Sequence, residues 1–551
     1  MNKGRRLFSL ALITSAVFCA MAADNQLVLY NGKIFTGNEN QLWAEAISIR
    51  GERIHRVGSN RFVLRNTHRS VEKINLGGRL VVPGFNDAHL HVFPQTDAFT
   101  LPFPPIPGPG ASLDELKDQI ADAASQLEPG RLILGVMGEL AFFDPQADRF
   151  QLDLAAPEHP VLLFTWSSHG GLVNTLAMEQ FNISEDEPDP FGGFYGRTED
   201  GVTVNGILFE YALFEVLAQI ASTIPLEARR QQYLTQAEMM AALGYTSAQE
   251  IPIGIDAARS RAIFHRLRPK IRYRVMCAAL RPEDPCFNRS RNRSSRVTLG
   301  GRKWLTDGTP IERTMALNNE YADDPGNFGV LNVPALSLDQ ILTRAIRGPR
   351  RANQPILHAV GDRAVDHLLD SFDRIAPMAR VRVRRPRIEH GDLIFPRHFE
   401  RIRQLGIVVV QNPVHLGIPE LDTRLDAATR AMAQPFASLL QAGIPFAIGS
   451  DLPNPNPYLD LFLAVTHPTR PEEALTMEQA VMAYTKGSAY AEFQEHHKGM
   501  LKRGYLADLA VLSQDIFAIP PSPDLLTTTS LLTLVGGERV HDSGSLPADP
   551  D

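Results

Sequence analysis

The stretch Leu80-Val-Val-Pro-Gly-Phe-Asn-Asp-Ala-His-Leu-His91 is an apolar run that ends in two histidines separated by one residue. Residues two apart in an extended strand project to the same side, so the rings of His89 and His91 can face one metal ion. The alternative is two unrelated polar side chains at a strand end. The pair by itself favours metal binding.

Further polar residues end apolar, strand-like runs later in the chain. His358 follows Ile356-Leu357, His390 ends Arg387-Ile-Glu-His390, and Asp451 ends Ile448-Gly-Ser-Asp451. The C-terminal ends of parallel strands meet at one rim of a (β/α)8 barrel, where barrel enzymes carry their active sites. The sequence therefore predicts an α/β protein with a (β/α)8 TIM barrel. The eight candidate strands are Leu80–Phe85, Tyr245–Gln249, Ile271–Ala278, Lys303–Thr306, Pro355–His358, Arg387–His390, Ile407–Gln411 and Phe446–Ser450.

Four histidines and one aspartate at four strand ends suit a divalent metal. Neutral imidazoles with a carboxylate are ligands for zinc, iron, nickel or manganese. We expect one or two ions per chain, with zinc favoured. The expected ligands are His89, His91, His358, His390 and Asp451.

Lys303 opens the apolar run Lys303-Trp-Leu-Thr-Asp307. A buried ammonium is costly to desolvate, so its position needs a reason. One interpretation is an ion pair with Asp307 or another carboxylate. The other is a carboxylated Lys303, whose carbamate would supply anionic oxygen ligands to two metals. The residues alone leave both open.

The two chain ends predict one small β-domain. Alternating apolar residues and turns occupy residues 25–82, and similar patterns return in Leu506–Leu512 and Ser530–Val535. The segment 92–243 is too long for a single barrel crossover and contains strand-like runs of its own. We interpret it as a large insertion after the first barrel strand, on the face that carries the chemistry.

The N-terminus predicts a cleavable signal peptide and therefore an exported protein. Lys3, Arg5 and Arg6 precede an uncharged stretch of 17 residues, and Ala20-Met-Ala22 offers a cleavage site. A membrane anchor is the alternative, but this stretch is at the short limit for a span. No second such segment follows, so we expect no stable membrane insertion after removal. For Cys277 and Cys286 we favour buried thiols over a disulfide.

Composition argues against some partners. Hydrophobic residues make up 44% and charged residues 21% of the 551, with a net charge of -7 and no basic stripe. Nucleic acid is therefore not an expected partner. We expect a small-molecule substrate, and a homodimer is left open.

From about residue 26 to 538 the sequence resembles the amidohydrolase superfamily, and more narrowly amidohydrolase family 3, which includes N-substituted formamide deformylase. Asn86 and Thr309-Pro-Ile-Glu312 depart from the family pattern and bear on specificity. The matching stretches are Val82–His91, Ser168-His-Gly-Gly-Leu-Val-Asn174, Gly206-Ile-Leu-Phe-Glu210, Lys303–Gly308 with Arg313-Thr314, His358-Ala-Val-Gly-Asp-Arg-Ala364, Arg387–His390, Gln411-Asn-Pro-Val-His415, Gly449-Ser-Asp-Leu-Pro453 and Leu506–Leu512.

The resemblance implies a (β/α)8 barrel with a small β-sandwich built from both chain ends. The implied boundaries are 1–22 for the signal peptide, 23–82 and 501–545 for the sandwich, and 83–500 for the barrel with its insertion at about 92–243. It also implies that His89, His91, Lys303, His358, His390 and Asp451 bind metal, and that Asp451 takes the proton of the attacking water.

Four further residues are candidates for substrate binding. His169 and His415 are placed to assist a developing oxyanion, although each is equally well explained by a local hydrogen bond. Glu210 and Arg313 bind substrate or, as we favour, brace loops.

The residues predict a metal-dependent hydrolase, and the resemblance implies that it cleaves a non-peptide C–N bond, such as a linear amide or an N-acyl or N-formyl amine. Metal-activated water would attack, with Asp451 as general acid and base. The same site would also serve a hydrolytic deaminase or a lactonase. A non-catalytic exported protein that binds metal or solute is the least favoured alternative.

Overall fold

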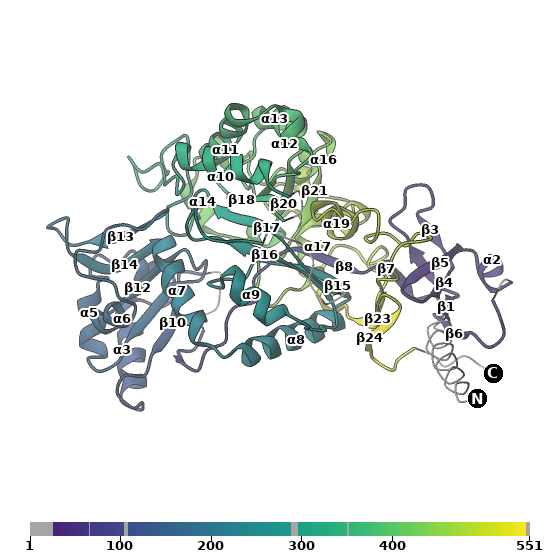
Figure 1. The fold of residues 1–551 in the computed structure, drawn as a ribbon, viewed down its shortest axis with the longest axis horizontal. Coiled ribbons are helices and arrows are strands. Elements are labelled where there is room, and N and C mark those ends of the chain that lie inside the picture. Colours follow the sequence, from purple (N-terminus) through teal and green to yellow (C-terminus); the bar gives the residue numbers. More distant parts are fainter. Residues whose placement is uncertain (1–25, 66, 104–107, 288–295, 350–351, 547–551) are drawn as a thin grey trace, which may run out of the picture.

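The computed structural model describes residues 26–546 except 66, 104–107, 288–295 and 350–351. The predicted signal peptide at residues 1–22 lies outside this range. Three parts follow one another along the molecule in Figure 1: an inserted sheet, a central barrel and a two-sheet end. Within the described range, no helix combines the length and apolarity needed to cross a bilayer.

Eight parallel strands form the central sheet, which confirms the predicted barrel. The two edges of this sheet come together near the metal-site candidates. There Asp451 N–H donates to the His89 carbonyl (2.9 Å), and Ser450 N–H donates to the Asp87 carboxylate (3.0 Å). The strands, in spatial order, are β21 (Phe446–Ile448), β20 (Val408–Gln411), β19 (Arg387–His390), β18 (Pro355–Ala359), β17 (Val297–Leu305), β16 (Arg272–Ala278), β15 (Tyr245–Glu250) and β8 (Phe85–Leu90).

Helices cover the outside of the barrel because each presents an apolar stripe. In α11, the buried residues Val365, Leu368, Leu369 and Phe372 recur at helical spacing and pack into the same core as the strands. The covering helices include α8 (Leu226–Ala242), α9 (Ala257–Phe264), α10 (Ala335–Arg347), α11 (Asp362–Ile375), α12 (Met378–Arg382), α13 (Pro396–Leu405), α16 (Phe436–Gln441) and α17 (Pro457–Thr466).

The first barrel strand differs from the prediction. Leu80–Pro83 (β7) pairs with strands of the two-sheet end, and the barrel strand begins only at Phe85. The chain passes between the two sheets at Gly84, where a Cβ atom would lie 2.0 Å from the Thr246 side chain. The apolar run is continuous across this glycine, so hydrophobicity alone could not reveal the change of sheet.

Both chain ends build the small β-sandwich, as predicted. Apolar side chains from its two sheets, such as Leu29, Ile47, Val81 and Leu532, share one core. One sheet contains β5 (Arg53–Gly58), β4 (Ala46–Arg50), β1 (Gln26–Tyr30) and β6 (Glu72–Asn75); the other contains β24 (Glu538–Asp542), β23 (Ser530–Val535), β22 (Leu509–Leu512), β7, β2 (Lys33–Phe35) and β3 (Trp43–Ala44).

The insertion after the first barrel strand folds around a sheet of its own, on the side of the barrel away from the sandwich (Figure 1). Helix α8, at the end of the predicted insertion, instead packs into the barrel core. The inserted sheet contains β13 (Gly193–Arg197), β14 (Val204–Glu210), β12 (Gly170–Val173), β11 (Val161–Thr165), β10 (Ile133–Met137) and β9 (Phe99–Thr100), with α3 (Leu113–Ala124), α4 (Glu139–Phe142), α5 (Arg149–Ala155), α6 (Thr175–Gln180) and α7 (Tyr211–Thr223).

The expectation of buried thiols was wrong. Cys277, in β16, forms a disulfide with Cys286 in the following connection. Their Cα atoms lie 5.8 Å apart, a separation usual for a disulfide. The separation of nine residues in the sequence did not indicate that the chain folds back and brings the two cysteines together.

Candidate metal centre

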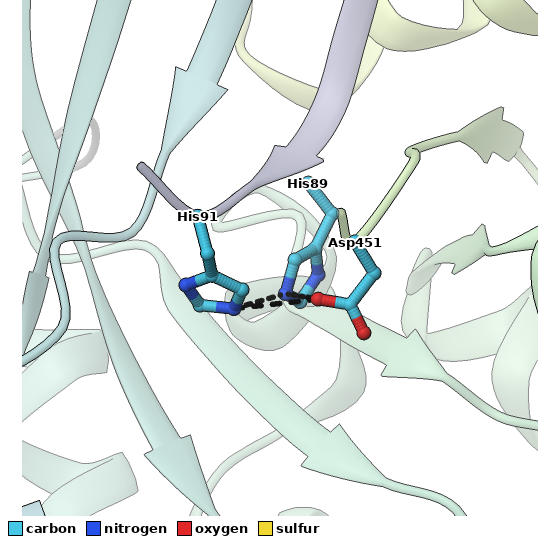
Figure 2. A group of neighbouring side chains, drawn as sticks. All are labelled: His89, His91 and Asp451. Carbon is cyan, nitrogen blue, oxygen red and sulfur yellow. Dashed lines mark hydrogen bonds and ion pairs between the residues drawn. The ribbon is translucent and has the colours of Figure 1, made fainter. Parts of the chain in front are cut away.

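His89, His91 and Asp451 converge at the rim of the barrel (Figure 2). The Nε2 atoms of the two histidines lie 3.1 Å apart, and Asp451 Oδ1 lies 3.3 and 3.4 Å from them. Ligands bound tetrahedrally at 2.0–2.1 Å from zinc are about 3.3–3.4 Å from one another. The three atoms therefore have the spacing of ligands around one small cation.

The hydrogen bonds of the two rings direct their lone pairs to the same point. Nδ1 of His89 faces Glu389 Oε2 at 2.6 Å, and Nδ1 of His91 faces the Ile251 carbonyl at 2.7 Å. Each acceptor fixes the ring proton on Nδ1, so both Nε2 atoms are left unprotonated. Two lone pairs and a carboxylate oxygen facing one another at this distance repel unless a cation lies between them. The donor set thus fits a divalent metal.

His358 and His390 lie at the same rim, and each also has one ring nitrogen hydrogen-bonded to an oxygen acceptor. The Gly308 carbonyl accepts from His358 Nε2 (3.1 Å), and Asn412 Oδ1 accepts from His390 Nδ1 (2.9 Å). The other ring nitrogens, His358 Nδ1 and His390 Nε2, remain as donors to a metal. The two rings lie 4.5 Å apart between centroids, and the His89 ring lies 4.9 Å from that of His390.

Backbone conformation brings two of these residues to the site. Strand alternation places Arg387 and Glu389 on the inner side of β19, which would turn the next residue outward. His390 and Asp451 both have a left-handed backbone, with φ of 68° and 55°. This conformation is rare outside glycine and costs energy, and such strain concentrates at functional sites.

Lys303 lies inside the rim but does not open its strand. It is the seventh of nine residues in β17, is 3% exposed, and places Nζ 3.5 Å from His89 Nε2. Burial lowers the pKa of the Lys303 ammonium to about 8, although the Glu389 and Asp451 carboxylates oppose this. Within the described part of the chain, its Nζ has no carboxylate oxygen within ion-pair distance.

The ion pair between Lys303 and Asp307, one of the two interpretations that the sequence left open, is absent for a clear reason. The Asp307 carboxylate accepts the backbone N–H groups of Ala316 (3.1 Å), Val360 (3.0 Å) and Gly361 (2.8 Å). Asp307 therefore fixes the loop after His358. Burial raises the pKa of this carboxyl to about 8 despite the three hydrogen bonds.

Burial dominates the electrostatics of the ligand rings. It lowers the pKa of His91 to about 3 and those of His358 and His390 well below their usual range. Burial opposes ionisation of Asp451 as well, but the surrounding histidines hold its pKa well below the usual value. Neutral rings beside an ionised carboxylate are the protonation states that metal binding requires.

The insertion contributes His169 to the site. The His169 ring lies 5.1 Å from that of His358, and its Nδ1 is 2.7 Å from Glu210 Oε2. Glu210 is fully buried and also accepts from Thr314 Oγ1 (2.7 Å) and Asn332 Nδ2 (3.1 Å). Glu210 thus orients His169. In the part of the chain that the structure describes, His169 Nε2 has no hydrogen-bond partner.

His415 and Arg313 have different surroundings. The His415 ring stacks on His390, with centroids 5.1 Å apart, beside Asp451. Arg313 pairs with Asp323 (2.9 Å) and lies over the Phe143 ring at 4.1 Å. Its described contacts are those of a loop brace.

Two functional residues escaped the sequence analysis although they stand in a quoted motif. Arg387 binds the Glu389 carboxylate through Nε (2.7 Å) and Nη2 (2.8 Å), and Glu389 in turn binds His89. Both side chains are fully buried. Charged residues two apart in a buried strand were a signal that they share an inward face.

The family comparison agrees with this geometry. The sequence profile of the Amidohydrolase family matches residues 72–541. N-substituted formamide deformylase of Arthrobacter pascens is 25% identical over 520 residues, which cover 90% of this chain and 94% of that protein. The putative amidohydrolase YtcJ of Bacillus subtilis (strain 168) is 27% identical over 549 residues, which cover 94% and 99% of the two chains.

Solved structures show the same fold. An uncharacterized metal-dependent hydrolase from Pyrococcus furiosus superposes with a TM-score of 0.65 at 24% identity, covering 89% of this chain and all of that one. Its counterpart from Pyrococcus horikoshii OT3 gives 0.66 at 21% identity, covering 90% and 99% of the two chains. With its family match spanning most of its length, the chain belongs to the amidohydrolase family.

Proposed function

We propose that the protein is an exported metal-dependent hydrolase that cleaves a non-peptide C–N bond, in a linear amide or an N-acyl or N-formyl amine. The observation that carries this proposal is the convergence of His89, His91 and Asp451 on one point, with His358 and His390 beside it. The similarity to a formamide deformylase supports the choice of substrate class.

The five converging residues and Lys303 would hold one or two divalent ions, with zinc favoured. A bound divalent cation lowers the pKa of water to near 7 and polarises a carbonyl group. The surrounding residues supply the rest. Asp451 takes a proton from the attacking water and returns it to the leaving amine, so that the C–N bond breaks.

His169 is the residue best placed to contact the substrate. Burial opposes protonation of His169, but the Glu210 carboxylate at its Nδ1 raises the pKa of the ring above its usual value, so the protonated ring can donate from Nε2 beside His358. A substrate carbonyl polarised in the reaction gains negative charge on oxygen, and a fixed donor beside it stabilises that charge. We assign this role to His169 and an orienting role to Glu210.

Lys303 is proposed to carry a carbamate. A buried amine with no ion pair among the described residues, 3.5 Å from a metal-binding nitrogen, lacks the partner that a buried ammonium needs. Reaction of the neutral amine with CO2, with release of one proton to solvent, gives a carbamate anion whose two oxygens would bind two cations. This would account for a lysine among the ligands.

Export is supported by the disulfide between Cys277 and Cys286, because disulfides persist mainly in oxidising compartments. Expression of the full chain with a C-terminal tag tests it. A mature protein that starts near residue 23 in the exported fraction supports a signal peptide. An unprocessed chain in the cytosol contradicts export.

The substrate class is tested by incubating purified enzyme with a panel of N-formyl and N-acyl amines. Release of both the amine and the carboxylate, abolished in Asp451→Asn, supports the proposal. Ammonia released from aminated heterocycles would instead indicate a deaminase, and hydrolysis confined to lactones would indicate a lactonase. Tight binding without turnover, unaffected by Asp451→Asn, would contradict catalysis.

A further inference from the structure

Two chains of polar contacts between residues connect the ends of β19, β20 and β21 in the same order. In the first, His390 Nδ1 binds Asn412 Oδ1 (2.9 Å) and Asn412 Nδ2 binds the Gly449 carbonyl (2.8 Å). In the second, Asp392 Oδ2 lies 2.9 Å from His415 Nδ1, and His415 Nε2 lies 3.4 Å from Asp451 Oδ2. This second chain of contacts runs from Asp392 to Asp451, so each of its ends lies two residues after the corresponding end of the first, which runs from His390 to Gly449.

The second chain is not needed to join the strands. The neutral link through Asn412 already connects all three ends, and a histidine between two carboxylates carries a desolvation cost that the amide does not. Asp392 is 1% exposed, and its Oδ1 atom has no partner among the described residues. A costly buried link beside the candidate catalytic aspartate points to a functional role.

The geometry also limits what His415 can do. Its Nδ1 is engaged by Asp392, so only Nε2 is directed at the site, 3.4 Å from Asp451 Oδ2. His390, His415 and Asp451 also have the spacing of a second candidate metal group, which the metal stoichiometry measured below separates from a positioning role. Its contact with Asp451 is to Oδ2, whereas Oδ1 of the same carboxylate faces His89 and His91. His415 and the two metal-binding histidines therefore hold opposite oxygens of one carboxylate.

We propose that His415, oriented by Asp392, is a positioning residue that fixes the Asp451 carboxylate with Oδ1 directed at the His89–His91 pair. Asp392 is itself held firmly: its carbonyl accepts the Gln434 N–H at 2.6 Å, and it follows two residues with left-handed φ, His390 (68°) and Gly391 (62°). The inference rests on the proposed role of Asp451 as acid and base.

The test compares His415→Gln and Asp392→Asn with wild type after loading with Co2+. The matched control is His398→Gln, which removes another buried histidine paired with an aspartate, Asp366 (3.0 Å), on the outer helix α13. We expect unchanged Co2+ stoichiometry in all three variants. We expect altered visible absorption bands in His415→Gln and Asp392→Asn, but not in His398→Gln, because the Asp451 carboxylate turns.

Turnover of the best amide substrate gives the second measurement. We expect kcat to fall ~10–100-fold in His415→Gln and Asp392→Asn with KM little changed, as for other groups that orient metal ligands. Loss of one Co2+ in His415→Gln would make His415 a ligand, and a higher KM at unchanged kcat would make it a substrate contact. Either result, or unaltered bands and kcat, overturns the proposal. The absorption bands decide the question even if no amide is turned over, which would refute only the proposed substrate class.

Discussion

Glu389 Oε2 lies 2.6 Å from His89 Nδ1 and connects barrel strands that are 300 residues apart in the chain. A carboxylate partner on the second ring nitrogen fixes the orientation of a metal-binding histidine and makes it a better ligand. Arg387 compensates the charge of Glu389 with two hydrogen bonds. Arg387 and Glu389 thus hold the His89 ring in place from the buried interior of the barrel.

Replacing Glu389 by glutamine should weaken metal binding without removing a ligand. We expect the metal affinity, measured by chelator competition, to fall ~10–100-fold. The Arg387 charge is left uncompensated, which should cost ~3–5 kcal/mol of unfolding free energy in urea titrations. Glu495→Gln is the control, because it breaks a partly exposed pair with Arg385 (2.5 Å).

A double variant separates the two effects. Arg387→Met combined with Glu389→Gln removes both charges, so stability should recover while the metal affinity stays low. If the affinity recovers together with the stability, the loss in Glu389→Gln reflects general unfolding and the link to His89 has no separate role.

Metal removal should destabilise the folded chain as well as inactivate it. The facing Nε2 atoms of His89 and His91, 3.1 Å apart, repel when no cation lies between them. Zinc at 100 times its dissociation constant should add about 2.7 kcal/mol to the unfolding free energy. Thermal unfolding after chelation and after readdition of zinc measures this, and a melting temperature unaffected by either step would contradict the site.

Lys303→Met keeps the aliphatic stem of the lysine and removes the amine. If Lys303 carries a carbamate that holds two ions, metal analysis should show two per wild-type chain and one or none in the variant. Native mass spectrometry of wild type should show an added CO2 that is lost on acidification. Equal metal content in the two proteins would exclude Lys303 from the site.

The sequence predicted the barrel and the candidate ligands that meet at its rim because strand ends are local features. His89 and His91 follow from a two-residue period, and His358 from its place after an apolar run. Local sequence patterns do not show which distant residues come into contact in the folded protein. The contact of Glu389 with His89 and the Cys277–Cys286 disulfide depend on how distant backbone segments meet.

Backbone strain was equally invisible. Alternation along β19 would direct His390 away from Glu389, and only the left-handed φ of His390 returns it to the site. The same holds for Asp451 after β21. The resemblance pointed to both residues as family motif positions, whereas the physical reason for their orientation required the fold.

Replacing His169 tests the contribution of the insertion to catalysis. His169→Ala should lower kcat ~10²–10³-fold, as expected when one donor to a developing oxyanion is lost, with metal content unchanged. Glu210→Gln should act in the same direction but less, because glutamine still accepts a hydrogen bond from His169 Nδ1. His367→Gln, which removes a hydrogen bond to the Val333 carbonyl (3.0 Å), is the control. A normal kcat in His169→Ala would leave His169 as a loop residue.

Acid stability should depend on His398, far from the metal. Burial and the neighbouring Arg397 lower the pKa of His398 to about 4, and Asp366 only partly opposes them. The unfolded chain, with a histidine pKa of ~6.5, binds the proton first. Stability from this group is therefore complete above about pH 6.5 and falls by up to ~1.4 kcal/mol per pH unit as pH drops toward 4. His398→Gln cannot titrate, so its urea-unfolding free energy should fall less steeply than that of wild type between pH 6.5 and 4. Parallel curves for the two proteins would show that His398 titrates alike in both states.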